Sequence, residues 1–159
     1  MNNSIEARDL YFSYGGADAV AGVTLPVKRG EFVSLIGPNG SGKTTLLRLL
    51  SGVLRPKRGS VEMLGRDARR MSRRDIARTV AVVPQETTSA FAFTSEEIVL
   101  MGRFAYLGPY GFESEHDVEA AREAMRLTDT AQFAQRHIED LSGGERQRVI
   151  IARALAQGA

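Results

Sequence analysis

The 159-residue sequence predicts an α/β fold with an added helical subdomain. Three observations support this prediction. Short apolar segments separated by turn residues fill the first half, a glycine-rich loop lies between one such segment and a helical run, and helical periodicity dominates after Gln85. At this length we expect one sizeable core that buries about 70% of the surface of the unfolded chain.

Five segments of the first half predict strands. Each is apolar or alternates apolar with polar residues, and Gly or Pro lies at the end of several. They are LYFSY (10–14), AVAGVTLPV (19–27), EFVSLI (31–36), SVEML (60–64) and AVVP (81–84). The third segment ends at Gly37, where the glycine-rich loop begins, so the order strand, loop, helix is predicted there.

Helices are predicted by apolar residues at helical spacing together with start and stop signals. Leucines at this spacing follow Lys43, and Gly52 ends that run. A Ser or Thr precedes each later helix as a candidate N-cap: Ser72 with Asp75, Thr94 with Glu97, Ser114, Thr130 and Ser142. The last helix, from about Gly143, carries Val149, Ile150, Ile151 and Leu155 around most of its circumference and is expected to be buried.

The composition is that of an ordinary soluble protein, with 43% hydrophobic and 25% charged residues. The absence of cysteine excludes disulfides and Cys-based metal or redox sites. No run of 18 apolar residues is present, so a role at a membrane requires another subunit. The net charge of +2 gives little support to general polyanion binding. Six Arg in residues 66–78 are best explained as a solvated helix face, with a nucleic-acid or lipid patch as the alternative.

The loop GPNGSGKT, residues 37–44, has the composition of a phosphate-binding loop. Gly37, Gly40 and Gly42 allow successive backbone N–H groups to point inward around a phosphate. Lys43 adds a mobile positive charge at a helix N-terminus, and Thr44 offers a hydroxyl to Mg²⁺. The predicted ligand is a purine nucleoside triphosphate with Mg²⁺.

A second glycine-rich helix start follows at LSGGERQR, residues 141–148. Ser142 is expected to cap the helix and to donate to a phosphate oxygen, while Gly143 and Gly144 expose their N–H groups. One nucleotide cannot approach two such helix starts from the same side. This second site is therefore expected to serve a nucleotide held by another chain.

These motifs together resemble the nucleotide-binding domain of ATP-binding cassette (ABC) proteins over essentially the whole chain. GPNGSGKTT resembles the Walker A motif, LSGGERQ the signature motif, and Gln85 the Q-loop glutamine. The resemblance implies ATP contacts from Tyr14 (stacking on adenine), Gly37, Pro38, Asn39, Gly40, Ser41, Gly42, Lys43, Thr44, Thr45, Ser142, Gly143, Gly144 and Gln147. It also implies Mg²⁺ contacts from Thr44 and Gln85, with Gln85 and Lys43 in catalytic roles.

The family's fold is a P-loop NTPase (RecA-like) core with an antiparallel β subdomain and a helical subdomain bearing the signature motif. The resemblance therefore implies a strand-rich part over residues 1–85 with Walker A, a helical part over 86–140, and the signature motif with its helix over 141–159. The sequence departs from the family pattern because the Walker B Asp, the catalytic Glu, the D-loop and the switch His are absent from these residues. Both His116 and His137 precede the signature motif and are expected to be surface groups. We therefore expect a cassette that lacks the C-terminal part of its core and, alone, does not hydrolyse ATP.

The stretch 94–111 is similar to importers of iron siderophores, haem and cobalamin. The resemblance implies a head-to-tail dimer of two cassettes on the cytoplasmic face of the cell membrane. It also implies transmembrane permease subunits as partners and, indirectly, an external solute-binding protein, with no nucleic acid. Two alternatives stay open: a non-catalytic ATP-binding fragment, and a soluble ABC ATPase of translation or DNA repair.

Overall fold

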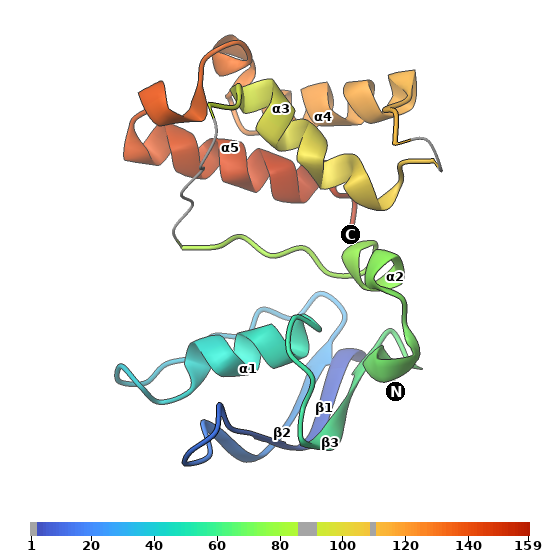
Figure 1. The fold of residues 1–159 in the computed structure, drawn as a ribbon, viewed down its shortest axis with the longest axis vertical. Coiled ribbons are helices and arrows are strands. Elements are labelled where there is room, and N and C mark those ends of the chain that lie inside the picture. The colour runs from blue at the N-terminus through green and yellow to red at the C-terminus, as the bar shows by residue number, and fades with distance from the viewer. Residues whose placement is uncertain (1–2, 86–91, 109–110) are drawn as a thin grey trace. The chain divides into compact units, whose positions relative to one another are not determined.

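The computed structural model describes residues 3–85, 92–108 and 111–159 (Figure 1). Residues 86–91, which follow Gln85, and residues 109–110 lie outside this description. The chain forms two compact units, residues 1–79 and 80–159, and each is described separately below. No helix in the described residues is long and apolar enough to cross a membrane.

The first unit contains a four-stranded antiparallel sheet. Its strands are β1 (Asn3–Phe12), β2 (Val20–Lys28), β3 (Arg58–Met63) and β4 (Arg66–Asp67), in the order β2-β1-β3-β4. The central strand β1 pairs Ala7 with Leu25 on one side and with Val61 on the other. The antiparallel β part expected from the sequence is therefore present.

Helix α1 (Lys43–Leu50) starts directly after the glycine-rich loop, as predicted. Its leucines Leu46, Leu49 and Leu50 are buried, and Leu47 is exposed, so one face of the helix is apolar and covered. Ala7, Leu10, Val61 and Met63 of the sheet are buried in the same unit. The 3₁₀ turn η1 (Ala68–Arg70) and the short helix α2 (Arg73–Ala77) complete it, and Ser72 and Asp75 form the predicted capping box of α2.

The second unit is helical. Its elements are α3 (Ser95–Leu100), η2 (Met101–Ala105), α4 (Glu115–Leu127), η3 (Ala131–Phe133), η4 (Ile138–Asp140) and α5 (Gly143–Ala156). Helix α5 packs against both α3 and α4 (Figure 1). Ile98, Val99, Met125, Val149 and Ile150 form the centre of their shared core. The capping boxes at Thr94 and Ser114 are present, with Glu97 and Asp117 as the acidic partners.

Two segments predicted as strands, 31–36 and 81–84, have no regular secondary structure. A strand is defined by hydrogen bonds to a neighbour, and none of the described residues pairs with either segment in a ladder. Phe32 and Ile36 are accordingly more than 90% exposed, at 94% and 92%.

Two helical predictions also need correction. Thr130 starts a 3₁₀ turn and not a helix, because its hydroxyl bonds back to the carbonyl of Met125 at 3.2 Å and does not cap the residues that follow. In α5, Val149 and Ile150 are fully buried, but Ile151 and Leu155 are 37% and 49% exposed. Helices α3 and α4 cover only one side of α5 among the described residues, so the expected burial of most of its circumference, with Ile151 and Leu155 included, is not found there.

Candidate functional site

The glycine-rich loop has the backbone that a phosphate site requires. Gly40 and Gly42 have φ values of +81° and +84°, a region that favours glycine. Gly42 is also the N-cap of α1, and a Cβ placed there would lie 2.1 Å from the carbonyl oxygen of Ala19. A side chain at Gly42 is therefore excluded twice, by backbone conformation and by contact with the residue before β2.

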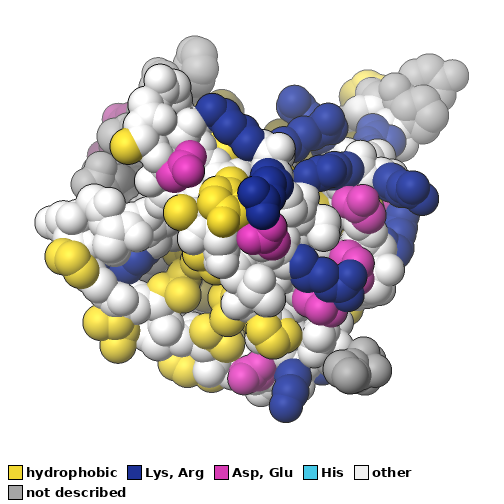
Figure 2. All heavy atoms as spheres, turned by 90° about the horizontal axis from the view of Figure 1, so that it is seen from below, with side chains coloured by type: hydrophobic (Ala, Val, Ile, Leu, Met, Phe, Trp, Pro, Cys, Tyr) yellow, Lys and Arg dark blue, Asp and Glu magenta, His cyan; other side chains and the backbone are white. Residues whose placement is uncertain are grey.

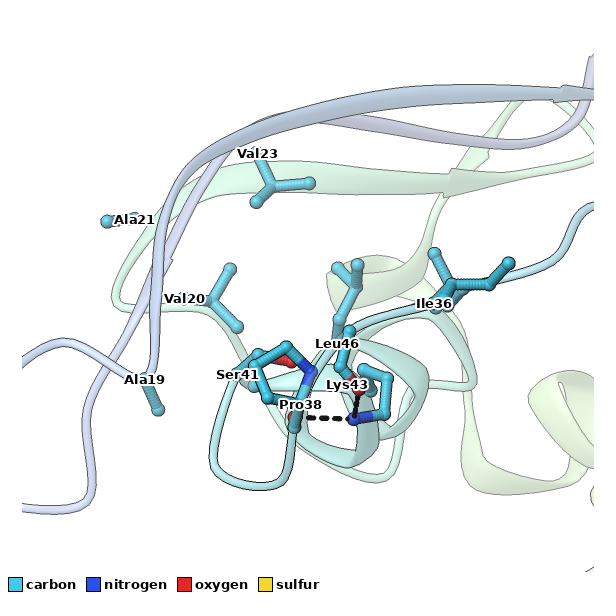
Figure 3. A pocket seen from close by; sticks show the side chains of 12 residues that line it. Ala19, Val20, Ala21, Val23, Ile36, Pro38, Ser41, Lys43 and Leu46 are labelled. Carbon is cyan, nitrogen blue, oxygen red and sulfur yellow. Dashed lines mark hydrogen bonds between the residues drawn. The ribbon is translucent and has the colours of Figure 1, made fainter.

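Lys43 folds back over this loop. Its Nζ donates hydrogen bonds to the carbonyl oxygens of Gly37 and Pro38, each at 2.8 Å (Figure 3). The ammonium group is therefore already held at the mouth of the loop by two neutral acceptors. A phosphate oxygen is a stronger partner because it is charged, so an incoming phosphate can replace one of these carbonyls without moving the helix.

A cavity of about 470 Å³ adjoins the loop. Its polar end is formed by the loop, with Lys43 and Ser41. Its walls carry aliphatic side chains from β2, from segment 31–36 and from α1 (Figure 3). Val20, Val23, Ile36 and Leu46 are among them. The cavity is thus polar where phosphate would bind and apolar beyond it.

Tyr14 lies beside the start of α1, where the resemblance to the family places an adenine-stacking ring. Its hydroxyl is 3.4 Å from Oγ1 of Thr45, and Arg48 donates to it at 3.5 Å. These contacts, with Thr45 first, lower the pKa of Tyr14 below its usual range. Phe12 supports one side of the ring in an edge-to-face contact with centroids 4.9 Å apart, and the side chain is still 63% exposed. The structure therefore brings Tyr14 to the phosphate loop and leaves ring surface open for a base.

Thr44 and Thr45 differ in what they offer to a ligand. Thr45 is buried and bonded to Tyr14, whereas Thr44 is exposed at the first turn of α1. An exposed hydroxyl at this position suits Mg²⁺, which takes one or two protein oxygens and completes its shell with phosphate and water. The described residues contain no group of three acidic or His side chains that could hold a metal by itself. The exposed hydroxyl of Thr44 thus fits a metal that arrives with a nucleotide.

The second glycine motif starts α5 in the second unit. A Cβ placed at Gly143 or Gly144 would meet no described atom within 4 Å, and neither residue has a positive φ, so the fold does not demand glycine at either position. Their N–H groups donate to none of the residues that the structure describes, as is usual in a first helical turn. The start of α5 is therefore an accessible set of donors, and Gln147 lies half-buried one turn later.

Ser142 is engaged differently from what the sequence suggested. It caps α5 by accepting from the N–H of Glu145, but its hydroxyl also donates to the Glu145 carboxylate at 2.6 Å. These bonds to Ser142 lower the pKa of Glu145. Donation from Ser142 to a phosphate, which remains a prediction, thus requires that this hydroxyl leave Glu145.

The remaining predicted site residues are exposed. Pro38, Asn39 and Ser41 are exposed in the loop, and Gln85 is the exposed residue at the end of the first described segment. His116 and His137 are exposed as expected, with Nδ1 of His137 at 3.1 Å from the carbonyl oxygen of Ala92. The ligand roles of Pro38, Asn39, Ser41 and Gln85 stay predictions.

Sequence analysis missed two arginines. Arg48 contacts Tyr14 one turn after the loop, and its position at helical spacing from Thr44 and Thr45 could have indicated this. Arg103 is 6% exposed and forms an ion pair with Asp117, the two side chains meeting at 2.9 Å. No local pattern signals that pair.

The comparisons with known proteins agree with the motifs. The family described as ABC transporter matches residues 20–159. The chain is 38% identical to the iron(3+)-hydroxamate import ATP-binding protein FhuC of Bacillus subtilis over 98% of its length, and covers 58% of that protein. It is 48% identical to the hemin import ATP-binding protein HmuV of Gloeobacter violaceus over 85% of its length, and covers 48% of that protein. The chain thus spans about half the length of these curated relatives.

Solved structures show the same fold. A transporter assigned to the metal-chelate ABC type, in an inward-facing conformation, matches with a TM-score of 0.81 and 33% identity over 99% of this chain and 57% of that one. A dimeric ATP-binding cassette in a post-hydrolysis state, bound to ADP and Pi, matches with a TM-score of 0.80 and 29% identity over 96% of this chain and 69% of that one. The predicted fold class is confirmed, and the chain belongs to the ABC transporter family.

Proposed function

We propose that this chain is part of the ATP-binding subunit of an ABC importer that takes up a metal chelate through separate membrane subunits. The observation that carries the proposal is the loop 37–44 at the start of α1, with Lys43 at its mouth, in a chain of this family. The fold and the loop support nucleotide binding. The relatives named as import ATP-binding proteins support the transport role.

In this proposal each predicted site residue has a separate task toward ATP, and Gln85 comes from the second unit. The loop donates backbone N–H groups to the β-phosphate, and Lys43 neutralises the outer phosphates. Tyr14 stacks on adenine with the face that Phe12 leaves open. Thr44, together with Gln85, would hold Mg²⁺, which when bound neutralises phosphate charge and helps to polarise the terminal phosphate. Gln85 would orient the attacking water.

The start of α5 would complete the site of a second copy. Its exposed N–H groups at Gly143 and Gly144 suit the terminal phosphate of a nucleotide bound by another cassette, in a head-to-tail dimer. The dimeric cassette among the similar structures supports this arrangement. Permease subunits would anchor the dimer at the cytoplasmic face of the membrane, and iron siderophore, haem or cobalamin would be the cargo.

The first experiment measures ATP binding by the full-length protein with a fluorescent ATP analogue. Lys43→Ala is expected to weaken binding at least about tenfold, because a charge-assisted contact to phosphate is lost. Lys28→Ala, which removes an exposed lysine outside the site, is the matched control and should bind as the wild type does. Equal binding by both variants would overturn the assignment of the loop.

The second experiment tests the cargo. The full-length protein is produced together with its permease in cells, and uptake of labelled ferric siderophore, haem and cobalamin is compared in wild type and Lys43→Ala. Uptake of one of the three that depends on Lys43 supports the proposal. If the protein binds ATP but uptake of none of the three metal chelates depends on Lys43, the nucleotide-site assignment stands and the importer assignment is refuted.

A further inference from the structure

The first unit carries a positively charged surface that the nucleotide site does not use. Residues 66–78 contain six Arg and two Asp, whereas the whole chain has 21 basic and 19 acidic residues, so acidic residues outnumber basic ones elsewhere. All six Arg side chains are exposed. Figure 2 shows Lys and Arg gathered along one side of the face that it draws, while hydrophobic side chains lie toward the other side.

The two Asp side chains of this stretch offset only two of its six positive charges. Asp67 accepts from the backbone N–H of Arg69 at 2.9 Å as the cap of η1. Asp75 is occupied by the capping box with Ser72, and its ion pair with Arg66 is long, at 3.7 Å. Both carboxylates thus serve the local backbone first.

Three of the arginine side chains have no partner among the described residues. The guanidinium groups of Arg70, Arg73 and Arg74 make neither a hydrogen bond nor an ion pair with any residue that the structure describes, and all three residues are exposed. Arg69, by contrast, donates to the carbonyl oxygen of Gly59. Three neighbouring guanidinium groups are therefore available to an external anion.

An independent feature lies beside these charges. Met63 pairs with Arg66, so Leu64 and Gly65 form the two-residue turn between β3 and β4, with φ values of 49° and 75°. A left-handed conformation is uncommon for leucine, and such outliers are a reason to ask about function. Leu64 is 63% exposed, and the contact between Arg66 and Asp75 ties this turn to α2. An aliphatic tip thus projects next to the unpaired arginines.

We propose that the surface formed by Leu64, Arg66, Arg70, Arg73 and Arg74, here called the arginine surface, binds the phosphate headgroups of an anionic lipid membrane. Guanidinium groups bind phosphate strongly, and an aliphatic tip beside them suits the boundary between headgroups and acyl chains. This choice of partner rests on the proposed function, which brings the chain to a membrane.

Nucleic acid fits this surface less well. Residues 64–78 contain no aromatic side chain on which a base could stack. Helix α2 spans only Arg73–Ala77 and does not offer the continuous helix that usually enters a DNA groove. Binding to a lipid surface requires neither feature, because such a surface is recognised by charge and by a shallow apolar contact.

The test uses the full-length protein and sedimentation with two kinds of vesicle, pure phosphatidylcholine and phosphatidylcholine with about 30 mol % phosphatidylglycerol. The test variant combines Arg70→Gln, Arg73→Gln and Arg74→Gln. The matched control combines Lys28→Gln, Arg29→Gln and Arg55→Gln, which removes the same charge from exposed positions of the same unit. Leu64→Asn tests the tip with a residue that tolerates positive φ.

We expect the wild type to bind the anionic vesicles and not the neutral ones. The test variant should lose about 100-fold of this binding, at about fivefold per arginine, whereas the control should lose less than about fivefold. At a salt concentration that screens the charges, Leu64→Asn should bind anionic vesicles a few-fold more weakly than the wild type does. Equal losses in the test and control variants, or equal binding to both vesicles, would overturn the proposal.

Two further measurements distinguish lipid binding from nucleic-acid binding and from nucleotide binding. Binding of a fluorescent oligonucleotide that is tighter than vesicle binding and lost in the test variant would overturn the choice of lipid. ATP-analogue binding is measured on every variant and should not change, since no residue of the arginine surface lies at the nucleotide site. If the wild type binds anionic vesicles but not ATP, the proposed function fails while this inference stands.

Discussion

Arg103 joins α4, the end of α5 and Tyr106 within the second unit, and its replacement should lower the free energy of unfolding. Its Nε pairs with Asp117, its Nη1 donates to the carbonyl oxygen of Ala156 at 2.8 Å near the end of α5, and its guanidinium stacks 3.9 Å from the ring centre of Tyr106. Arg103→Met keeps the length of the side chain and removes all three interactions. Breaking one partner of a buried ion pair costs about 3–5 kcal/mol.

The remaining contacts of Asp117 place the expected loss at the low end of this range. The carboxylate keeps two hydrogen bonds from Ser114, at 3.0 Å to the backbone N–H and 2.6 Å to the hydroxyl, so it is not left bare. We therefore expect Arg103→Met to lower the free energy of unfolding by about 3 kcal/mol, measured by urea unfolding.

The matched control is Arg126→Met, which breaks an ion pair with Glu123 on the surface of the same unit. The Arg126 side chain is 72% exposed, so its pair should contribute less than about 1 kcal/mol. A loss of less than about 1 kcal/mol for Arg103→Met, or equal losses in both variants, would refute the argument from burial.

The same pair predicts an acid dependence. The Ser114 hydroxyl, the Ser114 backbone and Arg103 lower the pKa of Asp117 from 3.8 to about 2. Because the folded pKa is depressed, this contribution is present above about pH 4 and is lost as the pH falls toward 2. Arg103→Met should raise the folded pKa and reduce the loss of stability over this range, though not abolish it. An unchanged acid profile in urea unfolding would contradict the role of Arg103.

Three further predictions concern the candidate site. Gly42→Ala should lower the free energy of unfolding by more than about 2 kcal/mol, measured by thermal unfolding. Gly65→Ala is the control, because Gly65 has a similar φ but no atom near the added methyl group, and it should lower the free energy of unfolding by only about 1 kcal/mol. Equal effects would exclude the steric clash at Gly42. Tyr14→Ala should weaken ATP-analogue binding about tenfold, and Tyr14→Phe should weaken it less than about threefold. If Tyr14→Phe weakened binding as much as Tyr14→Ala does, the hydroxyl and not the ring would be the group that binds. Glu145→Ala should lower the free energy of unfolding by about 1 kcal/mol but release the Ser142 hydroxyl from the carboxylate. Nucleotide-dependent dimerisation should therefore persist in this variant. Complete loss of dimerisation would mean that Glu145 itself takes part in the dimer.

Local features of the fold could be predicted from the sequence. The N-caps predicted at Ser72, Thr94, Ser114 and Ser142 are all present, and each forms a capping box with an acidic residue three positions later. The start of α1 at Lys43 is likewise local, since Gly42 is its N-cap and has a left-handed conformation. Such interactions have nearly the same geometry in any helix.

Other expectations depended on neighbours that are distant in the sequence. Segment 31–36 has a strand composition, but a ladder also needs a second strand beside it. The exposure of Ile151 and Leu155 was decided by which side of α5 meets α3 and α4.

The sequence by itself determined the family and the local chemistry of this protein. The loop at 37–44 and the start of α5 are short stretches whose backbone geometry follows from their own glycines and caps. Only the tertiary structure decided the contacts between distant residues: the approach of Ala19 to Gly42, the placement of Tyr14 beside Thr45, and the burial of Arg103 against Asp117. The physical reason is that these contacts join segments whose separation in space is set by packing, and no periodicity or motif encodes that separation.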